Sequence, residues 1–158
     1  MSFGVPLSSK GNARPGSTRE VVEKVLDARL RGDDTRLSEL LSDDVVMRPP
    51  PSLVASPLRN RELIVSLLAG RVIASVMQPG SVRREVGGIV CEGNTAVVRQ
   101  RLRGVLPDGS AYDNEYVWIY EIGDDGRVRY IEEHADTLYA YRTGIISPSM
   151  QAELECGT

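Results

Sequence analysis

Titratable side chains that can move a proton gather near the end of the chain. Glu133, His134 and Asp136 lie in the segment GDDGRVRYIEEHAD, and His134 is the single histidine among 158 residues. A carboxyl group that is desolvated beside apolar side chains has a raised pKa, which suits it to general acid or base chemistry near neutral pH. A histidine titrates in that range without burial. We therefore take these three residues as candidate catalytic groups.

Aromatic side chains supply the second part of the candidate site. Apart from Phe3, every aromatic residue lies at or after Tyr112. Four rings fall at alternating positions of one predicted strand and share one face: Tyr112, Tyr116, Trp118 and Tyr120. The Tyr116 hydroxyl, a further candidate catalytic group, can donate a hydrogen bond to a developing oxyanion, and the Asn114 amide can orient substrate or water. Trp118 and Tyr120 are interpreted as cavity wall.

Four segments in the second half of the chain have the composition of strands: 82–91, 95–106, 111–122 and 127–136. They are separated by short turns that contain Gly93-Asn94, Pro107-Asp108-Gly109 and Gly123-Asp124-Asp125-Gly126. Because short turns join antiparallel neighbours, these segments predict an antiparallel meander that carries both groups of candidate residues.

Charge pairing predicts which face of this sheet points inward. The register that places Arg103 opposite Asp113 also places Arg101 opposite Glu115, and opposite charges directly across strands are stabilising. We assign these pairs to the outer face. The inner face then carries the candidate substrate-binding residues of two strands: Val98, Gln100, Leu102, Asn114, Trp118 and Tyr120.

The last strand has two possible registers. If Ile131 lies opposite Trp118, then Glu133 lies opposite Tyr116 and points inward, whereas His134 points outward. A slip of one residue reverses the faces, so that His134 meets Tyr116 and Asp136 meets Asn114. We favour the first register because it buries Ile131 and Ala135.

Helical patterns precede the sheet. Ser17 to Glu20 fit a capping box, followed by the apolar stripe Val21, Val22, Val25, Leu26 and Leu30 up to Gly32. Asp34 is predicted to cap a second helix carrying Leu37, Leu40 and Leu41, and a brief strand follows at 45–47. Asn60 is predicted to cap a third helix with Leu63, Ile64, Leu67, Leu68 and Val72 on its buried side. Val25 of the first helix and Met47 of the brief strand are further candidate substrate-binding residues.

These elements predict one α+β domain over 17–142, with a flexible tail at 1–16 and an irregular extension at 143–158. The 19 basic and 22 acidic residues leave no excess of positive charge for nucleic acid. The sequence lacks an apolar run long enough for a membrane span or signal peptide, so we expect a cytoplasmic protein without membrane partners. Isolated Cys91 and Cys156 predict no metal site and no disulfide.

The segments LLSDDVVM, LPDG and GDDGRVRYIEEHAD, in this order and spacing, resemble the SnoaL-like branch of the ketosteroid isomerase superfamily over roughly residues 17–142. The resemblance implies a nuclear transport factor 2-like cone: a curved antiparallel sheet, or half-barrel, covered by three N-terminal helices. It also implies an apolar pocket and dimerisation through the sheet. Related proteins include bacterial polyketide cyclases, isomerases, dehydratases, limonene epoxide hydrolases and binders without activity.

Most active-site residues of those relatives have no counterpart in this chain. The tyrosine and the aspartate base of steroid isomerases match Val25 and Pro49, which can do neither task. Their oxyanion-binding acid matches Tyr116, and the last-strand aspartate of limonene epoxide hydrolases matches Glu133. The acid–base pair on the second strand of those hydrolases is not retained.

We therefore expect a small-molecule enzyme with acid–base chemistry and no cofactor, acting as a homodimer on a hydrophobic substrate. Isomerisation, cyclisation, dehydration and epoxide opening all fit, with Glu133 as acid or base and Tyr116 as stabiliser of the oxygen. The alternative is a binding or assembly protein that uses the same cavity without catalysis. A purely structural domain that dimerises through its sheet would have no pocket.

Overall fold

The computed structural model describes residues 16–156, so the predicted tail lies outside the described residues except for Gly16. The elements follow in the order α1 (Thr18–Arg31), α2 (Asp34–Leu40), β1 (Leu41–Arg48), α3 (Arg61–Leu68), α4 (Arg71–Ser75), β2 (Arg83–Glu92), β3 (Thr95–Val105), β4 (Ala111–Ile122), β5 (Val128–Ala135), α5 (Thr137–Arg142) and α6 (Pro148–Glu155). None of the helices within this described range is long and apolar enough to span a membrane.

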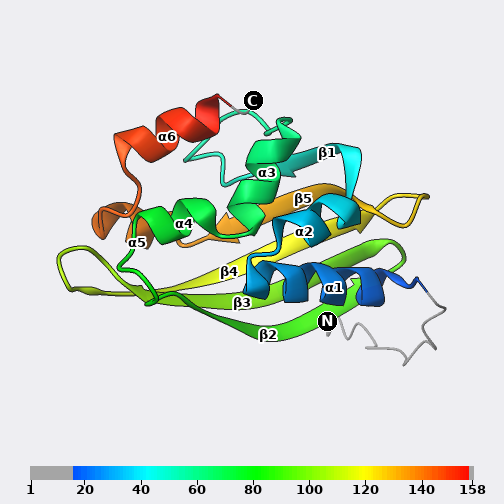
Figure 1. The fold of residues 1–158 in the computed structure, drawn as a ribbon, viewed down its shortest axis with the longest axis horizontal. Coiled ribbons are helices and arrows are strands. Elements are labelled where there is room, and N and C mark those ends of the chain that lie inside the picture. Colours follow the sequence, from blue (N-terminus) through cyan, green and yellow to red (C-terminus); the bar gives the residue numbers. More distant parts are fainter. Residues whose placement is uncertain (1–15, 157–158) are drawn as a thin grey trace, which may run out of the picture.

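The strands form one curved, unclosed sheet in the order β1-β5-β4-β3-β2, and helices lie over one face of it (Figure 1). Strands β2 to β5 are the predicted antiparallel meander. Strand β1 pairs with β5 in parallel, so the sheet is mixed rather than wholly antiparallel. This pairing joins residues more than 80 positions apart, so no short turn in the sequence predicts it. The α+β class is confirmed.

Helix α1 begins and ends where the sequence predicts, but its buried face differs. The Ser17 hydroxyl accepts a hydrogen bond from the Glu20 amide at 3.3 Å, and Gly32 ends the helix at a φ of 64°. Leu30, expected on the buried stripe, is 53% exposed, whereas Arg29 is only 4% exposed. The reason is geometric, because Arg29 lies seven residues after the fully buried Val22.

The next helices differ from the prediction in the cap of α2 and in the length of α3. Asp33, not Asp34, caps α2 by accepting a hydrogen bond from the Arg36 amide at 2.9 Å. Asn60 caps α3 as expected, but the predicted third helix is interrupted at Gly70. With a φ of 80°, Gly70 is in the left-handed region, and Val72 consequently lies in the separate helix α4.

The β3–β4 register is as predicted, with Arg103 opposite Asp113 and Leu102 opposite Asn114. The β4–β5 register differs from both alternatives, since Glu133 lies opposite Trp118 and Ala135 opposite Tyr116. The favoured register is therefore wrong by two residues. A shift of two residues preserves the facing of every side chain, so Glu133 still points inward.

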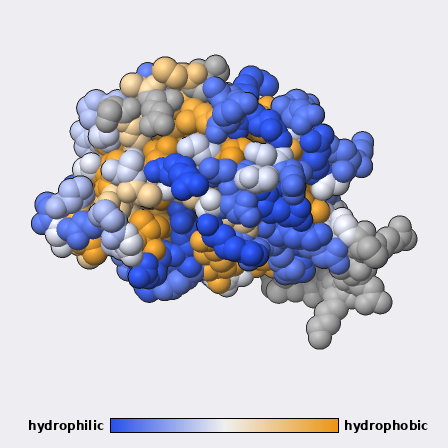
Figure 2. All heavy atoms as spheres, in the orientation of Figure 1, coloured by the Kyte–Doolittle hydropathy of each residue, from blue (hydrophilic) through white to orange (hydrophobic). Residues whose placement is uncertain are grey.

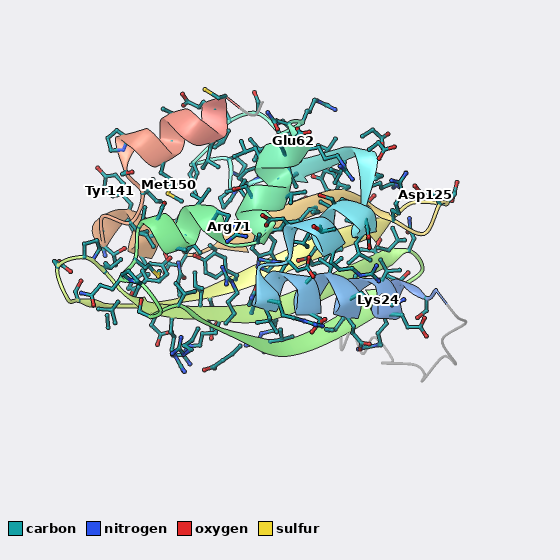
Figure 3. The ribbon with its side chains drawn as sticks, viewed as in Figure 1. Lys24, Glu62, Arg71, Asp125, Tyr141 and Met150 are labelled. Carbon is teal, nitrogen blue, oxygen red and sulfur yellow. The ribbon has the colours of Figure 1, made fainter. Side chains whose placement is uncertain are left out.

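The end of the chain is helical where an irregular extension was expected. The Ser147 hydroxyl accepts a hydrogen bond from the Met150 amide at 3.1 Å, and Pro148 occupies the first turn of α6, where its missing N–H costs nothing. Leu154 of α6 is buried. Helices α5 and α6, which carry Tyr141 and Met150, lie at the same end of the molecule (Figure 3).

Two clusters of buried side chains make up the core. The larger contains residues of α1 to α3 and of all the strands except β2, together with Leu154. The smaller contains Met77, Leu102, Leu106, Tyr112, Ala140 and Ile145, and Tyr116 packs against both. On the helix side, hydrophilic residues cover α1 and α2, and hydrophobic residues gather toward the end where α4, α5 and α6 lie (Figure 2).

Candidate functional site

A cavity of about 110 Å³ lies between the inner face of the sheet and the helices. One ordered water needs only roughly 10–15 Å³ on this scale, so the cavity has room for a small organic ligand. Its lining residues are Arg29, Met47, Pro49, Leu53, Leu67, Val72, Ile73, Arg84, Gln100, Leu102, Tyr112, Tyr116, Trp118, Glu133, Ala135, Thr137, Ala140, Ile145, Ile146, Met150 and Leu154.

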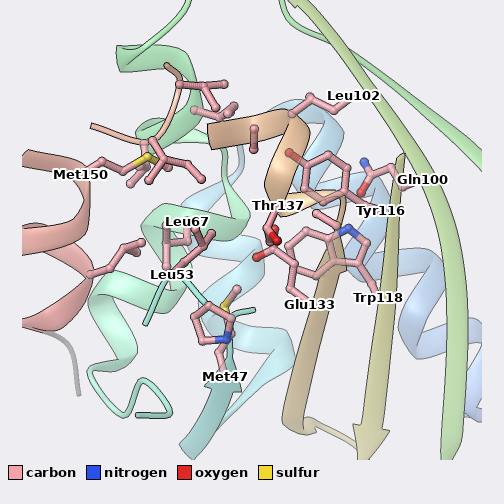
Figure 4. A pocket seen from close by; sticks show the side chains of 18 of the residues that line it. Met47, Leu53, Leu67, Gln100, Leu102, Tyr116, Trp118, Glu133, Thr137 and Met150 are labelled. Carbon is pink, nitrogen blue, oxygen red and sulfur yellow. The ribbon is translucent and has the colours of Figure 1, made fainter. Parts of the chain in front are cut away.

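The two walls of the cavity differ in chemistry (Figure 4). The sheet contributes Glu133, Tyr116 and Trp118, which point into it. The opposite wall, from the loop after β1 and from α3 and α6, is aliphatic and includes Leu53, Leu67 and Met150. Helix α6, unexpected from the sequence, therefore closes one side of the cavity.

Glu133 is a carboxyl group of β5 inside this apolar enclosure. Burial raises its pKa to about 7, and the positive charge of Arg29 offsets only part of that rise. No hydrogen bond to the carboxylate is present among residues 16–156. A carboxyl group in this condition exists in both protonation states near neutral pH and is not tied to a structural partner.

The Tyr116 hydroxyl belongs to a hydrogen-bonded chain at the cavity wall. It lies 2.9 Å from the Tyr112 hydroxyl, and the Asn114 amide donates to that same Tyr112 oxygen at 2.9 Å. Asn114 also donates to the backbone carbonyl of Asp136 at 3.1 Å, which fixes its orientation. Burial raises the pKa of Tyr116 far above its usual value, so the hydroxyl stays neutral and protonated.

Arg29 reaches the cavity from α1. Its guanidinium carbon lies 3.9 Å from the centroid of the Trp118 ring, and Nη1 donates to the Tyr120 hydroxyl at 2.5 Å. In the part of the chain that the structure describes, Arg29 Nε and Trp118 Nε1 are buried without a hydrogen-bond partner. The stacked ring compensates part of the cost of burying this charge.

Arg84 of β2 is the second cation of the lining. Burial, followed by the charge of Arg29, lowers its pKa to about 10, so it remains protonated at neutral pH. Within residues 16–156 its side chain forms neither a hydrogen bond nor an ion pair. The same range contains no group of three or more His, Cys, Asp or Glu side chains that could hold a metal ion.

Comparison with known families assigns this architecture. Residues 22–131 match the family described as the SnoaL-like domain. The chain belongs to the SnoaL-like family. A comparison of this SnoaL-like protein with curated proteins found no match.

Several solved structures share the SnoaL-like fold at low sequence identity. A candidate SnoaL-like polyketide cyclase from Jannaschia sp. CCS1 is 21% identical, with a TM-score of 0.67 over 87% of this chain and 99% of its own. Wild-type IdmH from Streptomyces antibioticus, a candidate polyketide cyclase, is 19% identical, with a TM-score of 0.65 over 79% of this chain and 96% of its own. TerC, co-crystallised with polyporic acid, is 18% identical, with a TM-score of 0.66 over 82% of this chain and 98% of its own.

The structure brings some of the predicted residues of this SnoaL-like chain together at the cavity. Those that line it are Glu133, Tyr116, Trp118, Gln100, Leu102 and Met47. Val25, Val98 and Tyr120 are not part of the lining; they are completely buried in the larger core cluster. Asn114 also lies behind the wall, where it supports Tyr112.

His134 and Asp136 do not reach the cavity. His134 points to the outer face, where its Nε2 lies 2.7 Å from the Glu132 carboxylate, because neighbouring residues of a strand alternate between faces. Asp136 caps α5 by accepting a hydrogen bond from the Tyr139 amide at 2.9 Å. Both side chains thus have local partners outside the cavity.

Sequence reasoning missed Arg29 and Arg84, although each had a signal. Arg29 occupies the helical position expected for an apolar residue of the α1 stripe. Arg84 lies opposite Leu102, which was correctly predicted to face inward, and directly opposed residues point to the same face. Counting residues back from the Gly93-Asn94 turn would not have paired Arg84 with Leu102, because the β2–β3 register shifts between Val86 and Gly88.

Proposed function

We propose that this SnoaL-like protein is an enzyme that performs acid–base chemistry on a small hydrophobic substrate without a cofactor. The observation that carries the proposal is Glu133, a carboxyl group with a pKa raised to about 7 that lines the cavity with no hydrogen-bond partner within the described range. The reaction belongs to the class of isomerisation, cyclisation, dehydration or epoxide opening. Each of these moves a proton beside an oxygen that gains negative charge.

Glu133 accepts a proton from the substrate and returns it at another atom. A group with a pKa close to the working pH is efficient at both steps, because both of its protonation states are populated. The aliphatic wall excludes water from the reacting atoms and holds an apolar substrate against Trp118. Leu53, Leu67 and Met150 contribute to this wall.

Tyr116 stabilises the oxygen on which charge develops. When the Tyr112 hydroxyl accepts from Asn114 and donates to Tyr116, the Tyr116 hydrogen is left for a substrate oxygen. Removing one such donor typically costs about 100-fold or more in rate. The SnoaL-like neighbours support this role of the cavity, since candidate polyketide cyclases and a protein co-crystallised with polyporic acid share the fold.

Elimination of 5-nitrobenzisoxazole tests the proposal without the natural substrate. A base removes the carbon-bound proton, the ring N–O bond breaks, and a coloured cyanophenolate is released. We expect the wild-type protein to catalyse this step with a rate that rises with pH to a midpoint near 7, as Glu133 ionises. The variant Glu133→Gln should lose about 100-fold or more of kcat/KM.

Glu132→Gln is the matched control, because Glu132 is the neighbouring carboxylate on the outer face and hydrogen bonds with His134 and Tyr130. It should keep the wild-type rate, whereas Tyr116→Phe should slow release of the phenolate. Equal rates for the wild-type protein and Glu133→Gln would contradict the proposed role of Glu133.

The alternative is a protein of the same fold that binds a small hydrophobic ligand without converting it. Val25 and Pro49 favour it, because they occupy the positions of the steroid isomerase tyrosine and aspartate. This alternative predicts ligand binding in the cavity together with no elimination activity above that of Glu133→Gln. Our proposal also places the enzyme in the cytoplasm as a homodimer.

A further inference from the structure

The Arg84 guanidinium lines the cavity without any partner in the described part of the chain. Arginines on the outer face differ, because Arg101 pairs with Asp113 at 2.6 Å and Arg103 with Glu85 at 2.6 Å. Arg84 is half-buried, and a guanidinium that is partly removed from water normally gains hydrogen bonds or an ion pair in exchange. The Arg84 donors are therefore open to a partner that these residues do not supply.

The fold makes room for Arg84. A Cβ atom at Gly70 would collide with the Arg84 guanidinium, so a larger residue there would displace it. Gly70 also has the positive φ that separates α3 from α4. The guanidinium of Arg84 thus lies against the backbone at this break.

Positive charge dominates the cavity. Two guanidinium groups, Arg29 and Arg84, line it together with one carboxyl group, Glu133. Arg84 lies opposite Leu102 on β3, and the next inward-facing residue of that strand, Gln100, lies opposite Tyr116 on β4. Arg84 therefore lies toward the Tyr116 side of the sheet wall.

Gln100 and Leu102 complete the surroundings of Arg84. Leu102 lies directly opposite Arg84 on β3, and Gln100 is the next inward-facing residue of that strand. The Gln100 side chain is buried in the cavity wall with no hydrogen bond among the described residues. Its amide provides a second donor near the guanidinium, and Leu102 provides an apolar surface.

We propose that Arg84, assisted by Gln100, binds a carboxylate group of the ligand, so that the natural substrate is an apolar carboxylic acid. The planar guanidinium matches a carboxylate with two parallel N–H donors. This inference rests on the proposed function only in sharing its cavity, because anion binding by Arg84 does not require catalysis by Glu133.

The test compares two ligands of the same shape, 3-cyclohexylpropanoate and its neutral amide, 3-cyclohexylpropanamide. Neither absorbs in the near ultraviolet, so emission from Trp118, the only tryptophan and part of the cavity wall, reports their binding. At pH 6, where Glu133 is mostly neutral, the wild-type protein should bind the carboxylate at least 10-fold more tightly than the amide.

Arg84→Gln should abolish this preference. It should weaken binding of the carboxylate at least 10-fold and leave the affinity for the amide unchanged. Arg84→Lys, which keeps the charge without the planar fork, should retain part of the preference. Arg83→Gln is the matched control, because Arg83 is exposed and contacts the backbone carbonyls of Gly80 and Val82. It should behave as the wild-type protein.

Failure of this inference and failure of the proposed function give different results. Glu133→Gln should keep the carboxylate preference while losing elimination of 5-nitrobenzisoxazole. Equal affinity of the wild-type protein for the two ligands would overturn the carboxylate site. An undiminished preference for the carboxylate in folded Arg84→Gln would do the same. Neither result bears on the role of Glu133, which the elimination assay tests.

Discussion

At the scale of single residues, Glu132 and Glu133 are adjacent carboxyl groups with opposite surroundings. Burial raises the pKa of Glu133 to about 7. Burial also acts on Glu132, but hydrogen bonds from His134 and Tyr130 and the charge of Arg48 outweigh it and lower the pKa. The alternation of strand residues between faces is sufficient to produce this contrast.

Glu133→Gln should stabilise the protein at alkaline pH. The folded state holds the Glu133 proton more tightly than the unfolded state, so this group makes the free energy of unfolding fall as pH rises from its ordinary pKa of 4.5 to about 7. Glutamine removes that penalty. The gain should be near zero at pH 4.5 and up to about 3 kcal/mol above pH 7.5, measured by urea unfolding at each pH.

Urea unfolding of Glu132→Gln should show a change in the free energy of unfolding of the opposite sign. This variant loses an ionised carboxylate that is stabilised in the folded state, so it should be less stable than wild type at pH 7. If Glu133→Gln also lost stability at pH 8, Glu133 would not be the desolvated carboxyl group described above.

Arg29 and Tyr120 form a buried pair that supports the cavity from behind. Tyr120→Phe should lower the free energy of unfolding by about 1–3 kcal/mol, because it leaves Arg29 Nη1 without its acceptor. Tyr130→Phe, which removes a hydroxyl that donates to Glu132 at 3.1 Å on the outer face, should cost less than about 1 kcal/mol. Urea unfolding of both variants checks the difference, and equal losses would argue against the Arg29–Tyr120 bond.

Residue patterns predicted the inward facing of Glu133 and the aromatic wall, but not the two cations. Alternation along a strand is local and strong, so Tyr116, Trp118 and Glu133 were placed on the inner face correctly. Arg29 is buried and Arg84 is half-buried, against the usual preference of arginine for the surface. Only the packing of α1 and β2 against other elements reveals where they point.

At the scale of elements, what could be predicted depended on distance along the chain. Hairpin β3–β4 was registered correctly from charges around a short turn. Strand β5 was misplaced by two residues, and the irregularity in its pairing with β4 between Glu121 and Ile122, which no composition signal marks, accounts for one of the two. The parallel pairing of β1 with β5 joins distant segments and was not predicted.

Helix α6 is the element whose contribution is easiest to isolate. Leu154 is buried and lines the cavity, whereas Ala152 on the same helix is exposed. Leu154→Asp should undock α6, because a charge in this apolar position is unpaired. Acrylamide should then quench the emission of Trp118 at least 2-fold more strongly than in wild type.

Ala152→Asp controls for the added charge and should leave the quenching unchanged. Unchanged quenching in Leu154→Asp, with native secondary structure, would show that α6 does not close the cavity.

At the scale of the whole molecule, the two faces of the sheet have different tasks. The inner face carries the cavity, and the outer face carries ion pairs such as Arg101–Asp113 together with the exposed apolar side chain of Val117. A second hollow, lined by Val86, Val117 and His134, lies on this outer face. These features support the proposed homodimer through the sheet.

Val117→Glu should therefore shift the protein from dimer to monomer, because it places an added charge in the centre of the proposed interface. Leu138→Glu is the control, since Leu138 is 56% exposed on α5. Sedimentation velocity at micromolar concentration checks both. A wild-type protein that sediments as a monomer at 100 µM would refute dimerisation through this face.

The measurement that tests the central claim most directly is the titration of Glu133 itself. Carbon-13 NMR of protein labelled at the glutamate carboxyl carbon follows each carboxyl group with pH, and Glu133→Gln identifies the resonance by its absence. A buried carboxyl group lining the cavity predicts a midpoint of about 7 for this resonance. A midpoint near the ordinary value of 4.5 would contradict it, and with it the proposed acid–base role.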